Sequence, residues 1–196
     1  MKLLSLCGSP RKGRNTDQVL DRVGRAFVEA GGEVEKLYVA DLDINPCTGC
    51  YGCMKDIDGI CVQQDDMSGL YRKLIDADAL AWGTPVYMWS PTAQMKLFLD
   101  RLFPFGDYQS TRWRCALDAT PVGLIMTYAD ADPIHSGIYH THAILDIVAK
   151  ASGGTVIGAA HAATSDDQLV LSESAPLMKS AAKLGADLAE AAKLRS

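Results

Sequence analysis

The sequence has no long hydrophobic run, no excess of basic charge and few aromatic residues. No apolar stretch approaches the length that spans a bilayer, so we expect no membrane segment. Lys and Arg number 19 against 24 Asp and Glu, and this net charge of −5 argues against a general nucleic-acid-binding protein. The apolar start of the chain is too short, and too soon followed by charge, for a secretory leader. We therefore expect a cytoplasmic protein whose six cysteines do not form structural disulfides.

Several common functional signatures are also absent from the sequence. No Ser/His/Asp order and no zinc-hydrolase motif stands out, and the glycine-rich dinucleotide fingerprint is missing. No repeat, linker or low-complexity segment divides the chain. The 196 residues, 48% of them hydrophobic, are enough for one globular domain with a large core.

Strand-like and helix-like segments alternate along the whole chain. Short apolar runs typical of buried strands are each followed by segments with apolar residues at helical spacing. Such alternation predicts an α/β fold with a single doubly wound, five-stranded parallel sheet of order 2-1-3-4-5. The expected strands cover residues 3–7, 34–39, 79–83, 122–126 and 155–160, and three of the expected helices cover 65–76, 138–151 and 176–194.

A loop rich in glycine and basic residues follows the first strand, with the sequence GSPRKGRNT over residues 8–16. We expect Asn15 to be the N-cap of the next helix, and Gln18 to complete a capping box. Free N–H groups and the helix dipole favour an anion at such a place. The loop therefore predicts a phosphate site. Its predicted ligands are Ser9, Arg11, Lys12, Asn15 and Thr16, with Arg14 adding further positive charge.

The spacing within this loop narrows the kind of phosphate. Gly8 and Gly13 are spaced as in a P-loop, but Arg14 and Asn15 stand where that motif has Lys and Ser/Thr. A Cys-x5-Arg phosphatase loop fails because Gly13 occupies the arginine position. The remaining interpretation is a site for a terminal monophosphate, such as that of flavin mononucleotide (FMN). The alternative is a basic surface loop without a ligand.

Two further loops at strand ends carry residues suited to a flat ring. Aromatic side chains and strand-end backbone groups can stack on such a ring and hydrogen-bond it. In the first loop, Ser90 and Pro91 are expected to begin the next helix, as N-cap and first helical residue. Packing onto that helix, and an ordinary buried tyrosine in the second loop, are the alternatives. The residues predicted to hold a ring are Pro85, Val86, Tyr87, Met88, Trp89, Thr127, Tyr128 and Asp130.

Four of the six cysteines lie in one loop, between about residues 45 and 64, with the spacing C-x2-C-x2-C-x7-C. The first three match the stem of iron–sulfur loops, because two intervening residues let each sulfur turn inward. A [4Fe–4S] cluster is the favoured interpretation. A four-cysteine zinc site, a redox-active thiol set and unrelated free thiols are the alternatives. The predicted ligands are Cys47, Cys50, Cys53 and Cys61.

Together these motifs resemble those of the flavodoxin-like NAD(P)H-dependent FMN reductase superfamily, and more closely its iron–sulfur flavoprotein branch. The resemblance includes Asp65-Asp66-Met67 after the cysteines, the segment Gly83–Tyr87, Lys96 and Asp100-Arg101. It runs through about the first 105 residues and continues more loosely to the fifth strand. It implies a single flavodoxin-like FMN-binding domain over residues 1–196, with the phosphate on the first loop and the ring on the other two.

The resemblance also implies a function. It implies an FMN-dependent oxidoreductase that passes electrons between a [4Fe–4S] cluster and the flavin, and on to a small acceptor, with no catalytic residue beyond the flavin. Ferredoxin and NAD(P)H are both open as electron donors, and a homodimer or homotetramer is expected. A cluster-free NAD(P)H-dependent FMN or quinone reductase is one alternative. A non-catalytic carrier or sensor with a structural four-cysteine zinc site is the other.

Overall fold

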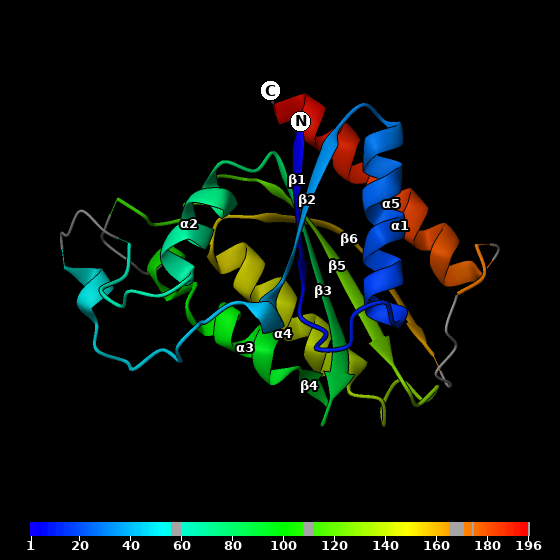
Figure 1. The fold of residues 1–196 in the computed structure, drawn as a ribbon, viewed down its shortest axis with the longest axis horizontal. Helices are drawn as coiled ribbons and strands as arrows, with labels where there is room; N and C mark the ends of the chain where they lie inside the picture. The colour runs from blue at the N-terminus through cyan, green and yellow to red at the C-terminus, as the bar shows by residue number, and fades with distance from the viewer. Residues whose placement is uncertain (56–59, 108–111, 165–170, 174, 196) are drawn as a thin grey trace.

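The computed structural model describes residues 1–196 except for 56–59, 108–111, 165–170, 174 and 196. A parallel sheet with helices on both faces forms the body of the molecule (Figure 1). The strand order β2-β1-β3-β5-β6 confirms the predicted order, because β4 is a two-residue strand off the main path. The strands are β1 (Lys2–Cys7), β2 (Glu33–Tyr38), β3 (Ala79–Tyr87), β4 (Ser90–Pro91), β5 (Pro121–Tyr128) and β6 (Thr155–Ala163).

The helices form two layers, one on each face of the sheet (Figure 1). One layer consists of α1 (Asn15–Glu29) and α5 (Pro176–Arg195), and the other of α2 (Met67–Ile75), α3 (Ala93–Asp100) and α4 (Ile138–Ala151). Single 3-10 turns lie at η1 (Val39–Asp41), η2 (Gly52–Met54) and η3 (Phe103–Phe105). Among the helices described, none is both long and apolar enough to cross a membrane.

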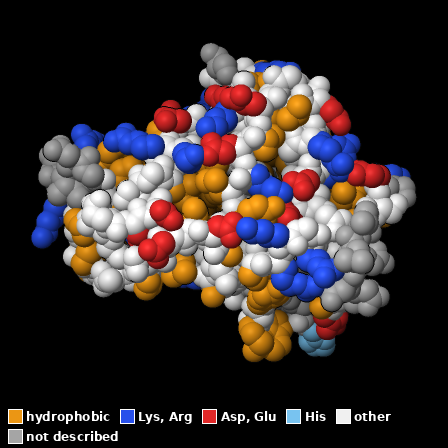
Figure 2. Space-filling model, viewed as in Figure 1, with side chains coloured by type: hydrophobic (Ala, Val, Ile, Leu, Met, Phe, Trp, Pro, Cys, Tyr) orange, Lys and Arg blue, Asp and Glu red, His pale blue; other side chains and the backbone are white. Residues whose placement is uncertain are grey.

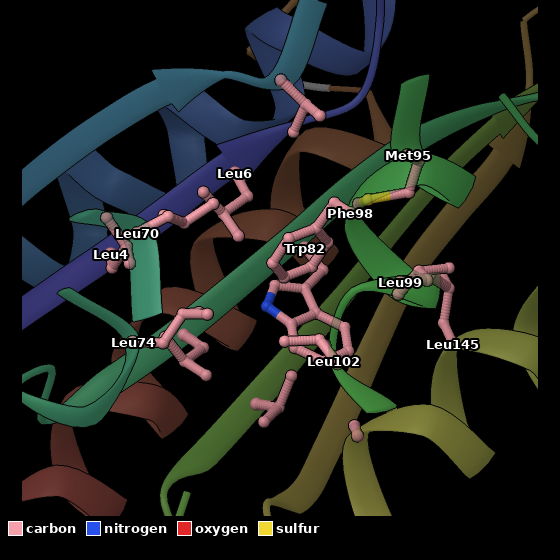
Figure 3. Packing of buried hydrophobic residues seen from close by; sticks show 14 of the residues in the cluster. Leu4, Leu6, Leu70, Leu74, Trp82, Met95, Phe98, Leu99, Leu102 and Leu145 are labelled. Carbon is pink, nitrogen blue, oxygen red and sulfur yellow. The ribbon is translucent and has the colours of Figure 1, made fainter. Parts of the chain in front are cut away.

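The larger core cluster fixes α2 and α3 against the sheet. Trp82 of β3 is fully buried, and its ring meets Phe98 of α3 edge to face, with centroids 5.5 Å apart. Leu70 and Leu74 of α2 lie on the other side of Trp82 (Figure 3). Truncation of such a buried aromatic side chain costs about 3–5 kcal/mol. The position of α3 is therefore strongly determined by packing.

The segment between β3 and α3 differs from the prediction. Ser90 and Pro91 do not begin a helix, because they form β4 and pair antiparallel with the end of β3. The tight turn at 88–89 has two residues in the left-handed region, with φ of 45° and 61°. The helix begins only after Thr92, whose hydroxyl accepts the N–H of Met95 at 3.1 Å.

The start of α1 also differs from the prediction. Arg14 occupies the N-cap position without a side-chain capping bond, and Asn15 is the first helical residue. The Asp17 carboxylate accepts the N–H of Gly13 at 2.6 Å, and the Gln18 amide donates to the Gly13 carbonyl at 2.9 Å. These two side chains close the loop where a capping box was predicted.

Candidate functional site

A cavity of about 580 Å³ lies where the loop between β1 and α1 meets the ends of β3 and β5. This is the carboxyl edge of the sheet, where doubly wound folds bind their ligands. The residues described in its wall include two arginines and no acidic side chain. The wall consists of Ser9, Arg11, Arg14, Asn15, Thr16, Pro85, Val86, Tyr87, Thr127, Tyr128, Ala129 and Thr164.

Gly8 brings the β1–α1 loop (residues 8–14) close to the start of α3. Its N–H donates to the Gly83 carbonyl at 2.7 Å, and its own carbonyl accepts the Thr92 hydroxyl at 2.6 Å. A Cβ at Gly8 would lie 2.8 Å from the Cβ of Met95, closer than two such atoms can approach. Glycine is therefore required here, and the loop is anchored to both β3 and α3.

Asp17 holds the same loop from inside α1. Its carboxylate is almost completely buried and accepts the Gly13 N–H and the Lys36 ammonium, each at 2.6 Å, and the Tyr38 hydroxyl at 2.9 Å. Burial alone would raise the pKa of the Asp17 carboxyl, but the hydrogen bonds from Lys36, Gly13 and Tyr38 outweigh burial and hold that pKa below its ordinary value. The loop is thus anchored on a buried carboxylate.

The polar groups of the cavity wall suit a ligand that carries both hydroxyls and negative charge. Asn15 Oδ1 is buried and has no hydrogen-bond partner among the described residues, so a ligand hydroxyl could satisfy it. The hydroxyls of Thr16 and Thr127 lie 2.7 Å apart and join the start of α1 to the end of β5. Arg11, Arg14 and the N-terminus of α1 supply the positive potential that an anionic group needs. A sugar-alcohol phosphate such as that of FMN fits this wall.

Four of the predicted site residues do not line the cavity: Lys12, Met88, Trp89 and Asp130. Lys12 is exposed, pairs with Asp41 at 2.5 Å, and lies over the Tyr38 ring at 4.8 Å from its centroid. The Asp130 carboxylate accepts the N–H of Asp132 at 2.9 Å within the loop after β5. Neither Lys12 nor Asp130 lines the cavity, and their predicted contacts with the phosphate and the ring stay predictions.

Met88 and Trp89 lie at the rim rather than in the wall. Their side chains are 82% and 56% exposed, and Figure 2 shows a hydrophobic protrusion below β3 and β4. The Trp89 indole donates to the His135 carbonyl at 2.7 Å, and a Cβ at Gly137 would lie 2.4 Å from the Trp89 Cα. The turn at residues 88–89 thus packs against the segment just before α4. It forms an apolar rim beside a polar cavity.

Tyr128 links the cavity wall to β6. Its hydroxyl shares a hydrogen bond of 3.2 Å with Nδ1 of His161, a residue outside every motif in the sequence. Burial lowers the pKa of His161, and the neighbouring His142 lowers it further. No local sequence signal pairs Tyr128 with His161, because the contact depends on the register of β5 and β6.

The four cysteines of the loop after β2 line one cavity of about 130 Å³. Cys47 and Cys50 are exposed, and Cys53 and Cys61 are half-buried. Within the described parts of the chain, no group of three or more His, Cys, Asp or Glu side chains is arranged to hold a metal ion. Residues 56–59, between the third and fourth cysteines, lie outside the described part. The thiols therefore share a cavity without standing in ligating positions.

The chemistry of this cavity fits a thiolate-bound metal centre. Its wall adds the apolar Tyr51, Phe103 and Pro104 to the four thiols, and thiolates of this number select iron–sulfur clusters or zinc. Metal sites commonly close only when the metal binds, so separated sulfurs are compatible with this chemistry. Burial raises the pKa of the Cys53 thiol, and nearby cysteines raise it further, so binding would release protons here.

The helix α3 connects the two cavities. At its start, Thr92 hydrogen-bonds the Gly8 carbonyl under the β1–α1 loop. At its end, Asp100 and Arg101 line the four-cysteine cavity. Its eight residues correspond to a length of about 12 Å.

A larger hollow of about 810 Å³ lies along α1 and the start of α5 and reaches Gly13 in the β1–α1 loop. Its acidic and basic side chains pair with one another, as Lys36 does with Asp21 and Arg25 with Glu173. Because these charges are mutually satisfied, the hollow offers no distinct binding chemistry.

These features define a flavodoxin-like α/β fold with a basic loop at the carboxyl edge of its sheet. The model of the NADPH-dependent FMN reductase family matches residues 1–168, and the chain belongs to this family.

Curated relatives support the iron–sulfur flavoprotein branch that the motifs predicted. An iron–sulfur flavoprotein from Archaeoglobus fulgidus is 43% identical over 106 residues, which are 54% of this chain and 47% of that protein. The iron–sulfur flavoprotein MJ1083 from Methanocaldococcus jannaschii is 36% identical over 104 residues, 53% of each chain. The chain thus matches about half the length of these relatives. A solved structure named flavone reductase shares the fold, with a TM-score of 0.73 at 19% identity, over 98% of this chain and 63% of that one.

Proposed function

We propose that this chain binds FMN in the cavity at the ends of β1, β3 and β5 and acts as a flavin-dependent oxidoreductase. The observation that carries the proposal is the composition of the cavity wall. A helix N-terminus and two arginines lie there beside the ends of two strands, and none of the residues described in the wall is acidic. Ser9, Arg11, Asn15 and Thr16 would hold the phosphate and the sugar alcohol. Residues 85–87 and 127–128 would hold the ring.

FMN supplies one- and two-electron redox chemistry when bound, and an iron–sulfur cluster supplies one-electron chemistry. The residues of this chain contribute binding, orientation and proton placement. Arg11 and the N-terminus of α1 favour the charged end of the ligand, so they set its direction in the cavity. The Tyr128 hydroxyl and His161 Nδ1 share a hydrogen bond, which holds a proton at the wall of the FMN cavity.

We further propose that the four-cysteine loop binds a [4Fe–4S] cluster. Support comes from the cavity that all four thiols line, from the chemistry of four thiolates, and from the names of the relatives. In this proposal electrons pass between the cluster and the flavin, and on to a small acceptor. A one-electron carrier such as ferredoxin is the proposed donor, and NAD(P)H is the alternative.

The Arg11→Ala substitution tests the flavin site. A hydrogen bond to a charged group contributes about 1.5–3 kcal/mol, so we expect the dissociation constant for FMN to rise by about 10- to 100-fold. Riboflavin lacks the phosphate and should lose little affinity. Lys12→Ala is the matched control, because Lys12 pairs with Asp41 outside the wall and should leave both ligands nearly unaffected. If Arg11→Ala weakened the binding of FMN and of riboflavin equally, Arg11 would not be a phosphate ligand.

The Cys50→Ser substitution tests the cluster. After anaerobic reconstitution, iron and sulfide content should be high in the wild type and in Cys115→Ser, a half-buried cysteine outside the loop. Cys50→Ser should lose the cluster and keep FMN, because the β1–α1 loop is separate. A wild type that takes up neither iron nor sulfide, yet reduces acceptors with NAD(P)H, is a cluster-free reductase. Zinc without iron indicates the structural zinc site.

A further inference from the structure

A buried ion pair lies against the four-cysteine cavity. Arg101, directly after α3, and Asp65, just before α2, both have side chains only 1% exposed. The guanidinium contacts both carboxylate oxygens, with Nη2 at 3.1 Å from Oδ1 and Nη1 on Oδ2. The carboxylate also accepts the backbone N–H groups of Asn45 and Met67, at 3.0 and 3.1 Å. The pair therefore joins the start of the cysteine loop to α2 and α3.

The remaining contacts of Arg101 point into the cysteine loop. Nη1 donates to the Asn45 carbonyl at 2.9 Å, and Nη2 lies 3.6 Å from Sγ of Cys61. The Tyr71 hydroxyl donates to the Arg101 carbonyl at 2.6 Å and fixes its backbone. Nε is buried without a hydrogen-bond partner in the described part of the chain. Backbone and side chain together therefore hold the guanidinium beside Cys61.

Packing alone does not account for this pair. Removing two charges from water costs several kcal/mol per ion, and well-packed apolar residues often replace a buried pair without loss of stability. The planar guanidinium can, however, donate to a carboxylate, a carbonyl and a sulfur at once. Groups that hydrogen-bond metal ligands orient those ligands and tune the metal. The contact with Cys61 therefore indicates a role in the cysteine site.

We propose that Arg101 is a positioning residue of the four-cysteine site, holding Cys61 toward the cavity and keeping a positive charge beside its sulfur. This inference rests on the proposed function, in which the four cysteines bind a cluster. Reduction by one electron, from a chemical donor such as dithionite, adds one negative charge to the cluster. A fixed positive charge at the ligand sulfur favours that reduction and raises the reduction potential.

The test measures the midpoint potential and the iron retention of the reconstituted protein. The main variant combines Arg101→Gln with Asp65→Asn, so that no unpaired charge stays buried. Arg101→Lys keeps the charge and loses the planar fork. Lys183→Gln is the matched control, because it removes one exposed, paired positive charge from α5, on the opposite face of the sheet. FMN affinity is measured in all variants and should stay unchanged.

In the double variant we expect the reduced-to-oxidised ratio at fixed potential to fall about tenfold, which is about 59 mV for one electron. We also expect a chelator to remove iron at least about tenfold faster. Arg101→Lys should keep the potential but lose iron faster, and Lys183→Gln should match the wild type in both.

Unchanged potential and unchanged iron release in the double variant would overturn the proposal. If the double variant does not fold, Arg101→Lys decides the matter, because wild-type iron release in that variant would overturn it as well. A wild type that takes up no iron at all contradicts the proposed cluster and not the role of Arg101 within it, so the two failures are distinguishable.

Discussion

Replacing Asp17 with Asn tests how the β1–α1 loop is held. Asn retains one acceptor oxygen and loses the charge, so the Lys36 ammonium keeps only Asp21 as an ionic partner. Because the Gly13 N–H binds Oδ2 and the Lys36 ammonium binds Oδ1, one of these two donors faces the amide NH2 in place of an acceptor. A hydrogen bond to a charged group contributes about 1.5–3 kcal/mol. Because Lys36 is 20% exposed and keeps Asp21, we expect a loss of about 2 kcal/mol. For a domain of this size that lowers Tm by about 4–8 °C.

The matched control is Asp21→Asn. Asp21 binds the same lysine but is 55% exposed, and its described polar contact is Lys36 alone. An exposed pair of this kind contributes about 0–1 kcal/mol, so its loss should lower Tm by no more than about half as much. FMN affinity should fall in Asp17→Asn and not in Asp21→Asn, because only Asp17 anchors the Gly13 N–H. Equal effects of the two substitutions would refute the reasoning.

The dependence on pH gives a second check on Asp17. Its pKa is lowered in the folded protein, so its contribution is complete above the unfolded-state pKa of about 3.9. The contribution is lost as the pH falls through the lower folded-state pKa. The difference in unfolding free energy between wild type and Asp17→Asn, from denaturant titrations, should be constant from about pH 5 to 8 and shrink below about pH 4. A difference that stays constant below pH 4 would contradict the assignment.

Two further predictions concern the apolar rim. Gly137→Ala places a Cβ 2.4 Å from the Trp89 Cα at a φ of +76°, and should cost about 3 kcal/mol in chemical denaturation and change tryptophan fluorescence. Gly31→Ala, at a φ of +93° with nothing within 4 Å, is the control and should cost about 1 kcal/mol, so equal losses would exclude the clash. We also expect a homodimer or homotetramer in sedimentation experiments, with Trp89→Asp weakening it, because Met88 and Trp89 leave an apolar surface exposed. A monomeric mass across micromolar concentrations would contradict this expectation.

The parts of the fold that depend on local periodicity could be predicted from the sequence. The helix α4 has the predicted bounds, Ile138–Ala151, because its apolar spacing and its following glycines are both local signals. The sheet order follows from the alternation of elements and the handedness of their connections. The predicted cavity residues on β1, β3 and β5 come together for the same reason, since parallel strands end at one edge.

Features that depend on tertiary contacts could not be predicted in this way. In the turn, Met88 and Trp89 both have left-handed backbone angles, which cost about 1–2 kcal/mol each. The hydrogen bond from the Trp89 indole to the His135 carbonyl, just before α4, helps to offset this cost. Lys12 shares its basic character with Arg11, but Asp41 draws it away from the cavity. The burial of Arg101 is an exception that the sequence could have predicted. Arg101 lies three residues after Phe98, so helical spacing places both on the buried side of α3.

The contacts at the two ends of helix α3 raise the question of whether binding in one cavity changes affinity in the other. Thr92, just before its first turn, is hydrogen-bonded to the β1–α1 loop, and Arg101, just after its last turn, contacts the cysteine loop. If loading one cavity shifts this helix, the affinity of the other must change, and by reciprocity each ligand alters the binding of its counterpart by the same factor. Calorimetric titration of FMN into cluster-free and cluster-loaded protein measures that factor, and a value of one would show that the helix transmits nothing. A factor that strengthens binding would favour the fully loaded state, and a factor that weakens it would favour the half-loaded states.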